Sequence, residues 1–310
     1  MATHILFRGP QERNDCWQTM FAKALPSVVW HHWPNVEDKA AIEVIIAWKL
    51  PRDYQQDYPN LRVIFSVGAG VDQLNLDTVP EHIKVVRMLD PGIAKGMAEF
   101  IALHVLNIHR DTFHYINANK TATWKQLPTK ATSQRRVGIL GLGNLGQVAA
   151  NSLLALGFSV NGWSRSAKQL EGVRCFSGME QLEAFLSQTD VLVSLLPLTV
   201  HTQGLLNNKT LSQLPQGASI INVGRGEQLV TQDLLTLLDE AHLCFAVLDV
   251  FEHEPLSESD PLWSHPNVLV TPHIAAITQN ESAGKVLVEN VLRYINGQTM
   301  IGTVDRKAGY

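Results

Sequence analysis

The segment RVGILGLGNLG, from Arg136 to Gly146, decides how this chain folds. Its first half, Arg136–Leu140, is a short apolar run typical of a buried strand, and it leads directly into three spaced glycines. Gly141 permits the tight turn, Gly143 lets the backbone approach a bound group, and Gly146 lets a helix pack closely against the strand. The segment therefore predicts the first strand, turn and helix of a doubly wound α/β domain.

The helix after this turn is predicted over Asn144–Leu156, and Gly157 is a natural left-handed end for it. The unpaired N–H groups and the positive dipole end of such a helix attract phosphates. Asn144 and Leu145, the first helical residues, are therefore predicted to bind the pyrophosphate of a dinucleotide together with the glycines. The alternative is a glycine-rich turn that binds nothing.

Strand-like and helix-like runs alternate through the rest of this half of the chain. The strands are apolar throughout, as a sheet covered on both faces requires. We expect six or seven strands in one doubly wound sheet. The expected strands are Arg136–Leu140, Phe158–Trp163, Val173–Phe176, Asp190–Leu196, Ser219–Val223, Phe245–Val250 and Val268–Thr271, and the helices include Met179–Ser187 and Asp233–Asp239.

Residues 1–90 show the same rhythm and predict a second, smaller parallel sheet, so the fold class is α/β with two doubly wound domains. A long helix is expected from Ala94 to Asn119, polar residues 120–134 follow it, and the tail after Ser282 is again helical in pattern. The strands expected in the smaller sheet are His4–Arg8, Val28–Trp30, Glu43–Trp48, Leu61–Val67 and Lys84–Met88.

The composition narrows the class of protein. A length of 310 residues suits about two domains, and 45% apolar with 17% charged residues is ordinary for a globular enzyme. The formal net charge of −4, with no basic run, argues against a nucleic-acid partner. No apolar run approaches a membrane span, and the N-terminus predicts a strand, not a signal peptide. Cys16, Cys175 and Cys244 follow no metal or disulfide pattern, so we expect buried thiols, no bound metal and a cytoplasmic location.

The choice of cofactor depends on the end of the second strand of the larger domain. A site that prefers NAD would place an acid there to bond the ribose 2′-OH. Here Ser164 follows Trp163, and the first acid is Glu171. Arg165 can pair with a 2′-phosphate and Ser166 can donate to it, which favours NADP(H), unless Arg165 is only a solvated loop residue.

Three polar residues follow later strands of the same domain. Arg225 stands between two glycines after Ser219–Val223, Glu254 precedes Pro255, and His273 follows Val268–Thr271. Ligands of such sheets bind at the carboxyl ends of the strands. A guanidinium suits a carboxylate and its neighbouring carbonyl, and a histidine beside an acid can move a proton. Each residue alone could be an ordinary loop residue, but together they favour an active site for a 2-keto acid.

With these motifs the chain resembles the D-isomer-specific 2-hydroxyacid dehydrogenases over nearly its whole length. Within that family it is similar to the members that reduce glyoxylate and hydroxypyruvate. The family motifs are Gly141–Gly146, Leu195–Thr199, Asn222–Gly226, Leu248–Phe251 with Glu254-Pro255, and Asn267–His273, and the narrower similarity lies in Phe65–Asp72, Trp163–Ser166, Pro272–Thr278 and Val304–Tyr310.

The resemblance implies reduction of glyoxylate to glycolate and of hydroxypyruvate to D-glycerate, with NADP(H) preferred and NAD(H) used more weakly. Arg225 would bind the substrate carboxylate and polarise the C2 carbonyl, and His273 would donate a proton to the developing alkoxide. Glu254 would orient the imidazole and favour its charged form. Backbone amides of Ala69 and Gly70 would bind the carboxylate from the other domain.

The resemblance further implies that Trp48 narrows the substrate pocket, although a core tryptophan is an equal reading of that residue. It implies a flavodoxin-like lid domain of residues 1–100 and 283–310, a dinucleotide-binding domain of residues 101–282, and a homodimer formed through Ala94–Asn119. The residues that would contact the cofactor are Gly141, Gly143, Asn144, Leu145, Gly146, Trp163, Ser164, Arg165, Ser166, Leu196, Pro197, Thr202, Val223, Gly224, Asp249, His273 and Ala275.

Two alternatives to this function stay open. The first is a broader D-2-hydroxyacid or phosphoglycerate-type dehydrogenase, which needs extra cations near the lid, for which Lys49 and Arg52 are candidates. The second is a dinucleotide-sensing binding protein on the same fold, which would bind the cofactor without turnover.

Overall fold

The computed structural model describes residues 2–306, and these divide into two compact units. One unit combines the described residues up to Ile93 with those from Thr278 onward, and the other is Ala94–Ile277. The sequence placed the two boundaries at 100/101 and 282/283, a few residues later than these. Residues 307–310 of the terminal run that begins at Val304 lie outside the described residues.

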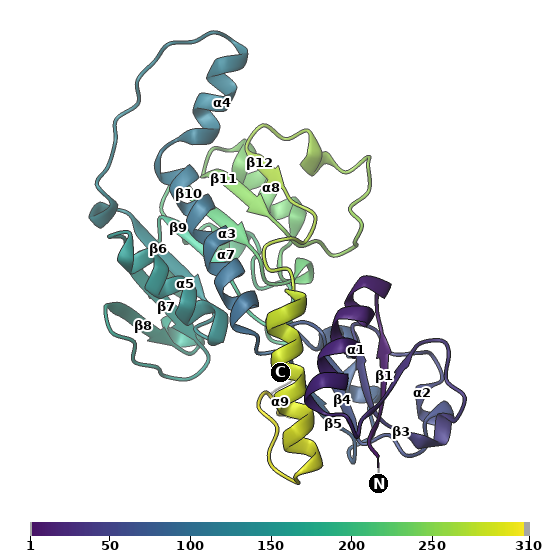
Figure 1. The fold of residues 1–310 in the computed structure, drawn as a ribbon. Coiled ribbons are helices and arrows are strands. Elements are labelled where there is room, and N and C mark those ends of the chain that lie inside the picture. Colours follow the sequence, from purple (N-terminus) through teal and green to yellow (C-terminus); the bar gives the residue numbers. More distant parts are fainter. Residues whose placement is uncertain (1, 307–310) are drawn as a thin grey trace. The chain divides into compact units, whose positions relative to one another are not determined.

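The larger unit is built on a seven-stranded sheet in which every neighbouring pair is parallel. The strand order is β12-β11-β10-β9-β6-β7-β8, so the chain moves outward from β6 in one direction and then from β9 in the other (Figure 1). This reversal between β6 and β9 is the point at which doubly wound sheets bind ligands. The strands are β6 Arg136–Leu140, β7 Ser159–Ser164, β8 Val173–Ser177, β9 Val191–Ser194, β10 Ala218–Asn222, β11 Leu243–Leu248 and β12 Val268–Val270.

Helices cover both faces of this sheet and bury its apolar strands, as the sequence predicted. One apolar cluster includes Ile101 and Leu153 from α3 and α5, and the opposite cluster includes Phe185 and Leu234 from α6 and α8. The helices of this unit are α3 Pro91–His109, which begins at the unit boundary, α4 Thr112–Lys120, α5 Asn144–Ala155, α6 Leu182–Leu186, α7 Asn208–Leu211 and α8 Thr231–Asp239.

The expected single helix from Ala94 to Asn119 is wrong in one respect, because the structure breaks it in two. α3 ends at His109, and Asp111 adopts a left-handed backbone with φ 54° before α4 begins. Aspartate is one of the few residues other than glycine that adopts this conformation readily. α4 therefore leaves the line of α3 and lies at the top of Figure 1.

The smaller unit has five parallel strands in the order β2-β1-β3-β4-β5, which is the flavodoxin-like order. The chain returns to this unit at Thr278 and adds a last helix, which packs on the first: the Trp17 indole nitrogen donates to the Asn280 carbonyl at 2.7 Å. The elements are β1 His4–Arg8, α1 Gln11–Ala24, β2 Val29–His32, β3 Ile42–Ala47, α2 Tyr54–Asp57, β4 Val63–Ser66, β5 Lys84–Val86 and α9 Asn280–Ile295.

The expectation of buried thiols is wrong. Cys16 and Cys175 are half-buried and Cys244 is exposed, and none of the three forms a disulfide. Cys175 lies on β8, an edge strand with only one neighbour, and Cys244 is the second residue of β11. Among residues 2–306, no helix is both long enough and apolar enough to span a membrane.

Candidate active site

The glycine turn between β6 and α5 has the form that a dinucleotide site needs. Gly141 has φ 107°, and a Cβ on Gly146 would lie 2.0 Å from the Gly141 carbonyl oxygen, so the protein itself requires both glycines. A Cβ on Gly143, in contrast, would meet no protein atom within 4 Å. Gly143 is also the N-cap of α5, and no side chain caps that helix end. The turn thus presents open backbone and uncapped N–H groups, which fits a bound pyrophosphate.

The loop after β7 displays the polar residues that the sequence assigned to cofactor choice. Trp163 is buried in the core, and its indole nitrogen donates to the Gly178 carbonyl at 2.8 Å. Ser164 is buried as well, and its hydroxyl donates to the Ser166 carbonyl at 2.8 Å, which folds the loop back on itself. Arg165 and Ser166 are exposed. The side chain of Trp163 therefore supports the loop from below, while Arg165 and Ser166 are the accessible groups.

The loop after β9 carries Leu196, Pro197 and Thr202. The Thr202 hydroxyl donates to the Pro197 carbonyl at 2.7 Å and closes this loop. Gln228, which is fully buried, donates from Nε2 to the Leu196 and Pro197 carbonyls at 3.0 and 2.9 Å. Gln228 was not predicted as a site residue, and nothing in its local sequence marks it, because its partners lie about thirty positions earlier in the chain.

Arg225 lies in the turn that follows β10. Asn222, at the end of that strand, donates from Nδ2 to the Arg225 carbonyl at 3.2 Å, and Gln228 Oε1 accepts from the Arg225 N–H at 3.1 Å. Gly226 has no room for a side chain, because a Cβ there would lie 1.8 Å from the Phe251 carbonyl carbon. The turn that holds Arg225 is therefore packed directly against the loop that leads to Glu254.

His273 and Glu254 form a hydrogen-bonded pair, as the family resemblance implied. The imidazole Nδ1 lies 2.8 Å from Glu254 Oε2, and Glu254 Oε1 accepts from the Phe251 N–H at 3.1 Å. Each side chain is a little over one third exposed. With Nδ1 donating to the carboxylate, Nε2 is the nitrogen left to exchange a proton with a ligand.

Asp249 holds the His273 loop in place. Its Oδ1 accepts from the Thr271 hydroxyl at 2.6 Å and from the Ile274 N–H at 2.9 Å, and its Oδ2 accepts from the Ala275 N–H at 2.9 Å. Asp249 is almost completely buried, so these bonds replace the solvation of its charge. The sequence suggested Asp249 and Ala275 as cofactor contacts, and the structure shows an anchoring role for both.

The smaller unit carries the other predicted substrate residues at the carboxyl ends of β3 and β4. Ser66 Oγ donates to the Gly70 carbonyl at 2.8 Å and accepts from the Gly68 N–H at 3.2 Å. No described residue accepts a hydrogen bond from the amides of Ala69 or Gly70. The turn is therefore held from one side and offers two backbone donors, an arrangement that suits an anion.

Trp48 directly follows β3 in the same unit and is 37% exposed, so it is not a core tryptophan. Its ring covers Gly68, because a Cβ on that glycine would lie 2.6 Å from Trp48 Cζ3. Trp48 and the turn with Ala69 and Gly70 thus form one surface of the smaller unit. No three His, Cys, Asp or Glu side chains gather as metal ligands within residues 2–306.

Comparisons with known proteins agree with this geometry. Residues 102–275 match the family model of the D-isomer specific 2-hydroxyacid dehydrogenase, NAD binding domain. The chain is 37% identical to glyoxylate/hydroxypyruvate reductase A of Serratia proteamaculans, over 99% of this chain and 100% of the relative.

Two solved structures resemble it over 100% of both chains. One is a D-isomer specific 2-hydroxyacid dehydrogenase from Xanthobacter autotrophicus in complex with NADPH and MES, with TM-score 0.94 and 36% identity. The other is an NADPH-dependent glyoxylate/hydroxypyruvate reductase from Sinorhizobium meliloti in complex with NADP and sulfate, with TM-score 0.92 and 34% identity.

Proposed function

This chain belongs to the D-isomer-specific 2-hydroxyacid dehydrogenases, and we propose that it reduces glyoxylate to glycolate and hydroxypyruvate to D-glycerate with NADPH. The observation that carries the proposal is the His273–Glu254 pair, 2.8 Å apart, at the carboxyl edge of a sheet whose glycine turn suits a dinucleotide. The relatives named for this activity, which match nearly the whole chain, support it.

The proton in this reaction comes from His273. Reduction of the C2 carbonyl creates an alkoxide, which must be protonated, and a bound nicotinamide cofactor would supply the hydride. Glu254 accepts the Nδ1 hydrogen bond and fixes the ring, so that Nε2 is the nitrogen that donates. In the oxidation of glycolate the same nitrogen must be neutral and accept the proton.

Arg225 binds the substrate. Its guanidinium can bond a carboxylate and the adjacent carbonyl oxygen, which holds the 2-keto acid and polarises C2. The amides of Ala69 and Gly70 add two donors for the carboxylate, and Trp48 beside them limits the size of the substrate. These residues suit a small acid such as glyoxylate or hydroxypyruvate.

NADPH is preferred over NADH because no acid stands at the end of β7. Ser164 occupies the position of the ribose-binding acid, and Arg165 and Ser166 after it are exposed. An arginine and a hydroxyl attract a 2′-phosphate, whereas an acid would repel it. Structures of relatives with NADPH or NADP bound support this choice.

The test is a steady-state panel that follows absorbance at 340 nm, with glyoxylate, hydroxypyruvate, larger 2-keto acids and 3-phosphohydroxypyruvate, each with NADPH and with NADH. We expect turnover of the first two acids and a clear preference for NADPH. Faster turnover of 3-phosphohydroxypyruvate would indicate a phosphoglycerate-type dehydrogenase. Cofactor binding without turnover of any acid would indicate a dinucleotide sensor.

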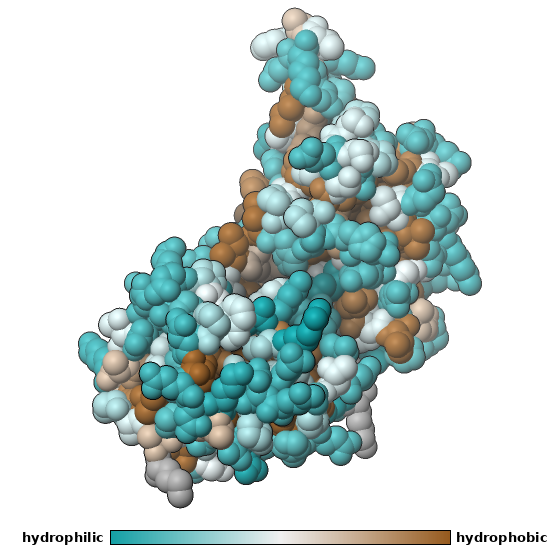
Figure 2. Space-filling model, turned by 90° about the vertical axis from the view of Figure 1, so that its right-hand side faces the viewer, coloured by the Kyte–Doolittle hydropathy of each residue, from teal (hydrophilic) through white to brown (hydrophobic). Residues whose placement is uncertain are grey.

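We place the enzyme in the cytoplasm and propose a homodimer formed through α3 and α4. Three unpaired cysteines support a reducing compartment. Leu103 on α3 and Ile116 on α4 are about half exposed, and Trp124, in the segment after α4, is fully exposed. Figure 2 shows hydrophobic atoms among the polar ones on the segment at the top of the view, which holds α4. Such side chains would mark an association surface where they gather in one patch.

A further inference from the structure

Lys168 makes a hydrogen bond that its position in the sequence does not predict. Its Nζ donates to the carbonyl oxygen of Leu142 at 2.6 Å, and Leu142 lies inside the glycine turn between Gly141 and Gly143. The side chain of Gln147 donates to the same oxygen at 3.1 Å. Lys168 belongs to the loop after β7, so this bond joins the loop that chooses the cofactor to the turn that binds its pyrophosphate.

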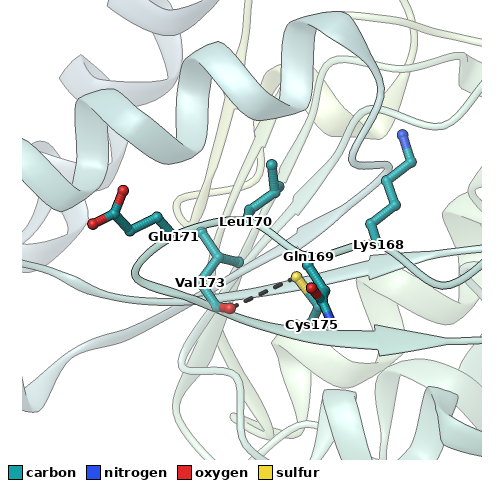
Figure 3. A pocket seen from close by; sticks show the side chains of 6 residues that line it. All are labelled: Lys168, Gln169, Leu170, Glu171, Val173 and Cys175. Atoms are coloured by element: carbon teal, nitrogen blue, oxygen red, sulfur yellow. Dashed lines mark hydrogen bonds between the residues drawn. The ribbon is translucent and has the colours of Figure 1, made fainter.

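The surroundings of Lys168 leave its charge available. An ammonium group has three donors, and one of them is used by Leu142. No carboxylate within residues 2–306 forms an ion pair with Lys168. Lys168 and Glu171 both line a shallow pocket beside this loop, and the Glu171 side chain points away from Lys168 (Figure 3). The other residues that line this pocket are Gln169, Leu170, Val173 and Cys175.

The position of Lys168 depends on how β6 and β7 end. The Gly141 N–H donates to the Trp163 carbonyl at 2.9 Å, so β6 and β7 end side by side. The side chain of Leu142 also packs on Gly162, because a Cβ there would lie 2.5 Å from Leu142 Cδ2. The ammonium of Lys168 therefore lies above the ends of both strands, next to the loop of Ser164 and Arg165.

We infer that Lys168 is a second cation for the 2′-phosphate of NADP(H), acting with Arg165 to set the preference for NADPH. The inference rests on the proposed use of NADPH. A phosphate monoester carries a charge of about −1.5 to −2 at neutral pH, which one arginine only partly balances. A lysine tethered to the glycine turn supplies the remaining charge and keeps the loop near the turn.

The test compares NADP⁺ and NAD⁺, which differ only in the 2′-phosphate, by titration calorimetry on the full-length protein. Lys168→Met removes the charge and the donor, and Lys168→Gln removes the charge but keeps a donor for the Leu142 carbonyl. We expect both variants to weaken NADP⁺ binding roughly 10- to 100-fold, the range for a lost hydrogen bond to a charged group. NAD⁺ binding should change less than about twofold, since it has no 2′-phosphate to lose.

Two controls accompany these variants. Lys168→Arg keeps the charge and should retain most of the NADP⁺ affinity. Lys209→Met removes a charge from an exposed position on α7 and should leave both cofactors unaffected. Thermal unfolding of each variant shows whether it is folded. If Lys168→Met does not fold, the binding of NADP⁺ and NAD⁺ to Lys168→Gln alone decides the outcome.

Equal weakening of NADP⁺ and NAD⁺ would overturn the inference, because Lys168 would then serve the pyrophosphate turn. Unchanged NADP⁺ binding in Lys168→Gln and Lys168→Met would overturn it as well. A failure of the proposed function gives a different result, since the wild-type protein would then show no preference for NADP⁺ over NAD⁺.

Discussion

Asp249 shows how much of this site depends on one buried carboxylate. Its two oxygens accept three hydrogen bonds from the loop of residues 271–275, and its backbone carbonyl accepts the His273 N–H at 2.9 Å. His273 has φ 53°, a left-handed conformation that non-glycine residues adopt at some cost. The Asp249 bonds on both sides of His273 hold the histidine in this conformation, with its ring against Glu254.

The first prediction concerns the proton donor. His273→Ala should lower kcat/KM for glyoxylate reduction on the order of 10²- to 10⁴-fold, the usual contribution of a general acid. Glu254→Gln keeps a hydrogen-bond acceptor but loses the charge, so the loss should be roughly tenfold. Steady-state kinetics with saturating NADPH measure both. Substantial activity in His273→Ala would mean that another group supplies the proton.

The second prediction separates substrate binding from cofactor binding. Arg225→Lys keeps the positive charge but loses the planar fork, so KM for glyoxylate should rise and kcat/KM should fall roughly 10- to 100-fold. The affinity for NADPH, measured by its fluorescence, should hardly change. Near-normal glyoxylate kinetics would remove Arg225 from the site.

The sequence could predict those site residues whose role follows from the strand next to them in the chain. Arg225 and His273 were proposed as site residues because each follows a strand, and the ends of parallel strands meet at one edge. Asn222, Gln228 and the anchoring role of Asp249 were not found. Their partners come from other elements, and a glutamine or asparagine beside an apolar strand looks the same whether or not it bonds a distant carbonyl.

At the scale of whole elements, the strands were predicted closely and the helices less so. A buried parallel strand is a short apolar run between polar turns, and this pattern is visible for β6 through β12. The break between α3 and α4 has no such signal, since neither glycine nor proline stands between Val105 and Lys120. The left-handed Asp111 is visible only in the structure.

The third prediction concerns the docking of α9 on the smaller sheet. The Tyr294 hydroxyl donates to Glu43 Oε2 at 2.9 Å, next to the start of β3. Burial, and then the hydrogen bond to this carboxylate, raise the pKa of Tyr294 from 10.0 to about 12. Tyr294→Phe removes the hydrogen bond and should lower the free energy of unfolding by about 1 kcal/mol at neutral pH.

The pH dependence of this difference follows from the raised pKa. The folded state holds the phenol proton more tightly than the unfolded state, so the stabilisation is complete below about pH 10 and is lost as the pH rises through about 12. Urea unfolding of wild type and Tyr294→Phe should therefore give a constant difference up to about pH 10 and a shrinking one above it. A difference that stays constant above that pH would contradict the role of the hydroxyl.

At the scale of the molecule, the chain returns at Thr278 to the smaller unit in which it began. The smaller unit is therefore built from two separate segments, and the larger unit from one. The expected first boundary lay a few residues later because α3 begins at Pro91, in the smaller unit, and continues into the larger one. A sequence pattern shows one uninterrupted helix there and cannot show where contacts change from one core to the other.

The last prediction concerns assembly. Leu103 is 53% exposed on α3, the helix through which the proposed dimer would form. Leu103→Asp should convert the expected dimer into a monomer, because a carboxylate would be buried without a partner in the interface. Leu156→Asp is the matched control, since Leu156 is 41% exposed after α5 and lies outside α3 and α4. Light scattering coupled to size exclusion gives the masses, relative to 34.4 kDa for one chain. A monomeric wild type would mean that there is no dimer interface. A dimer that only Leu156→Asp disrupts would place the interface outside α3 and α4.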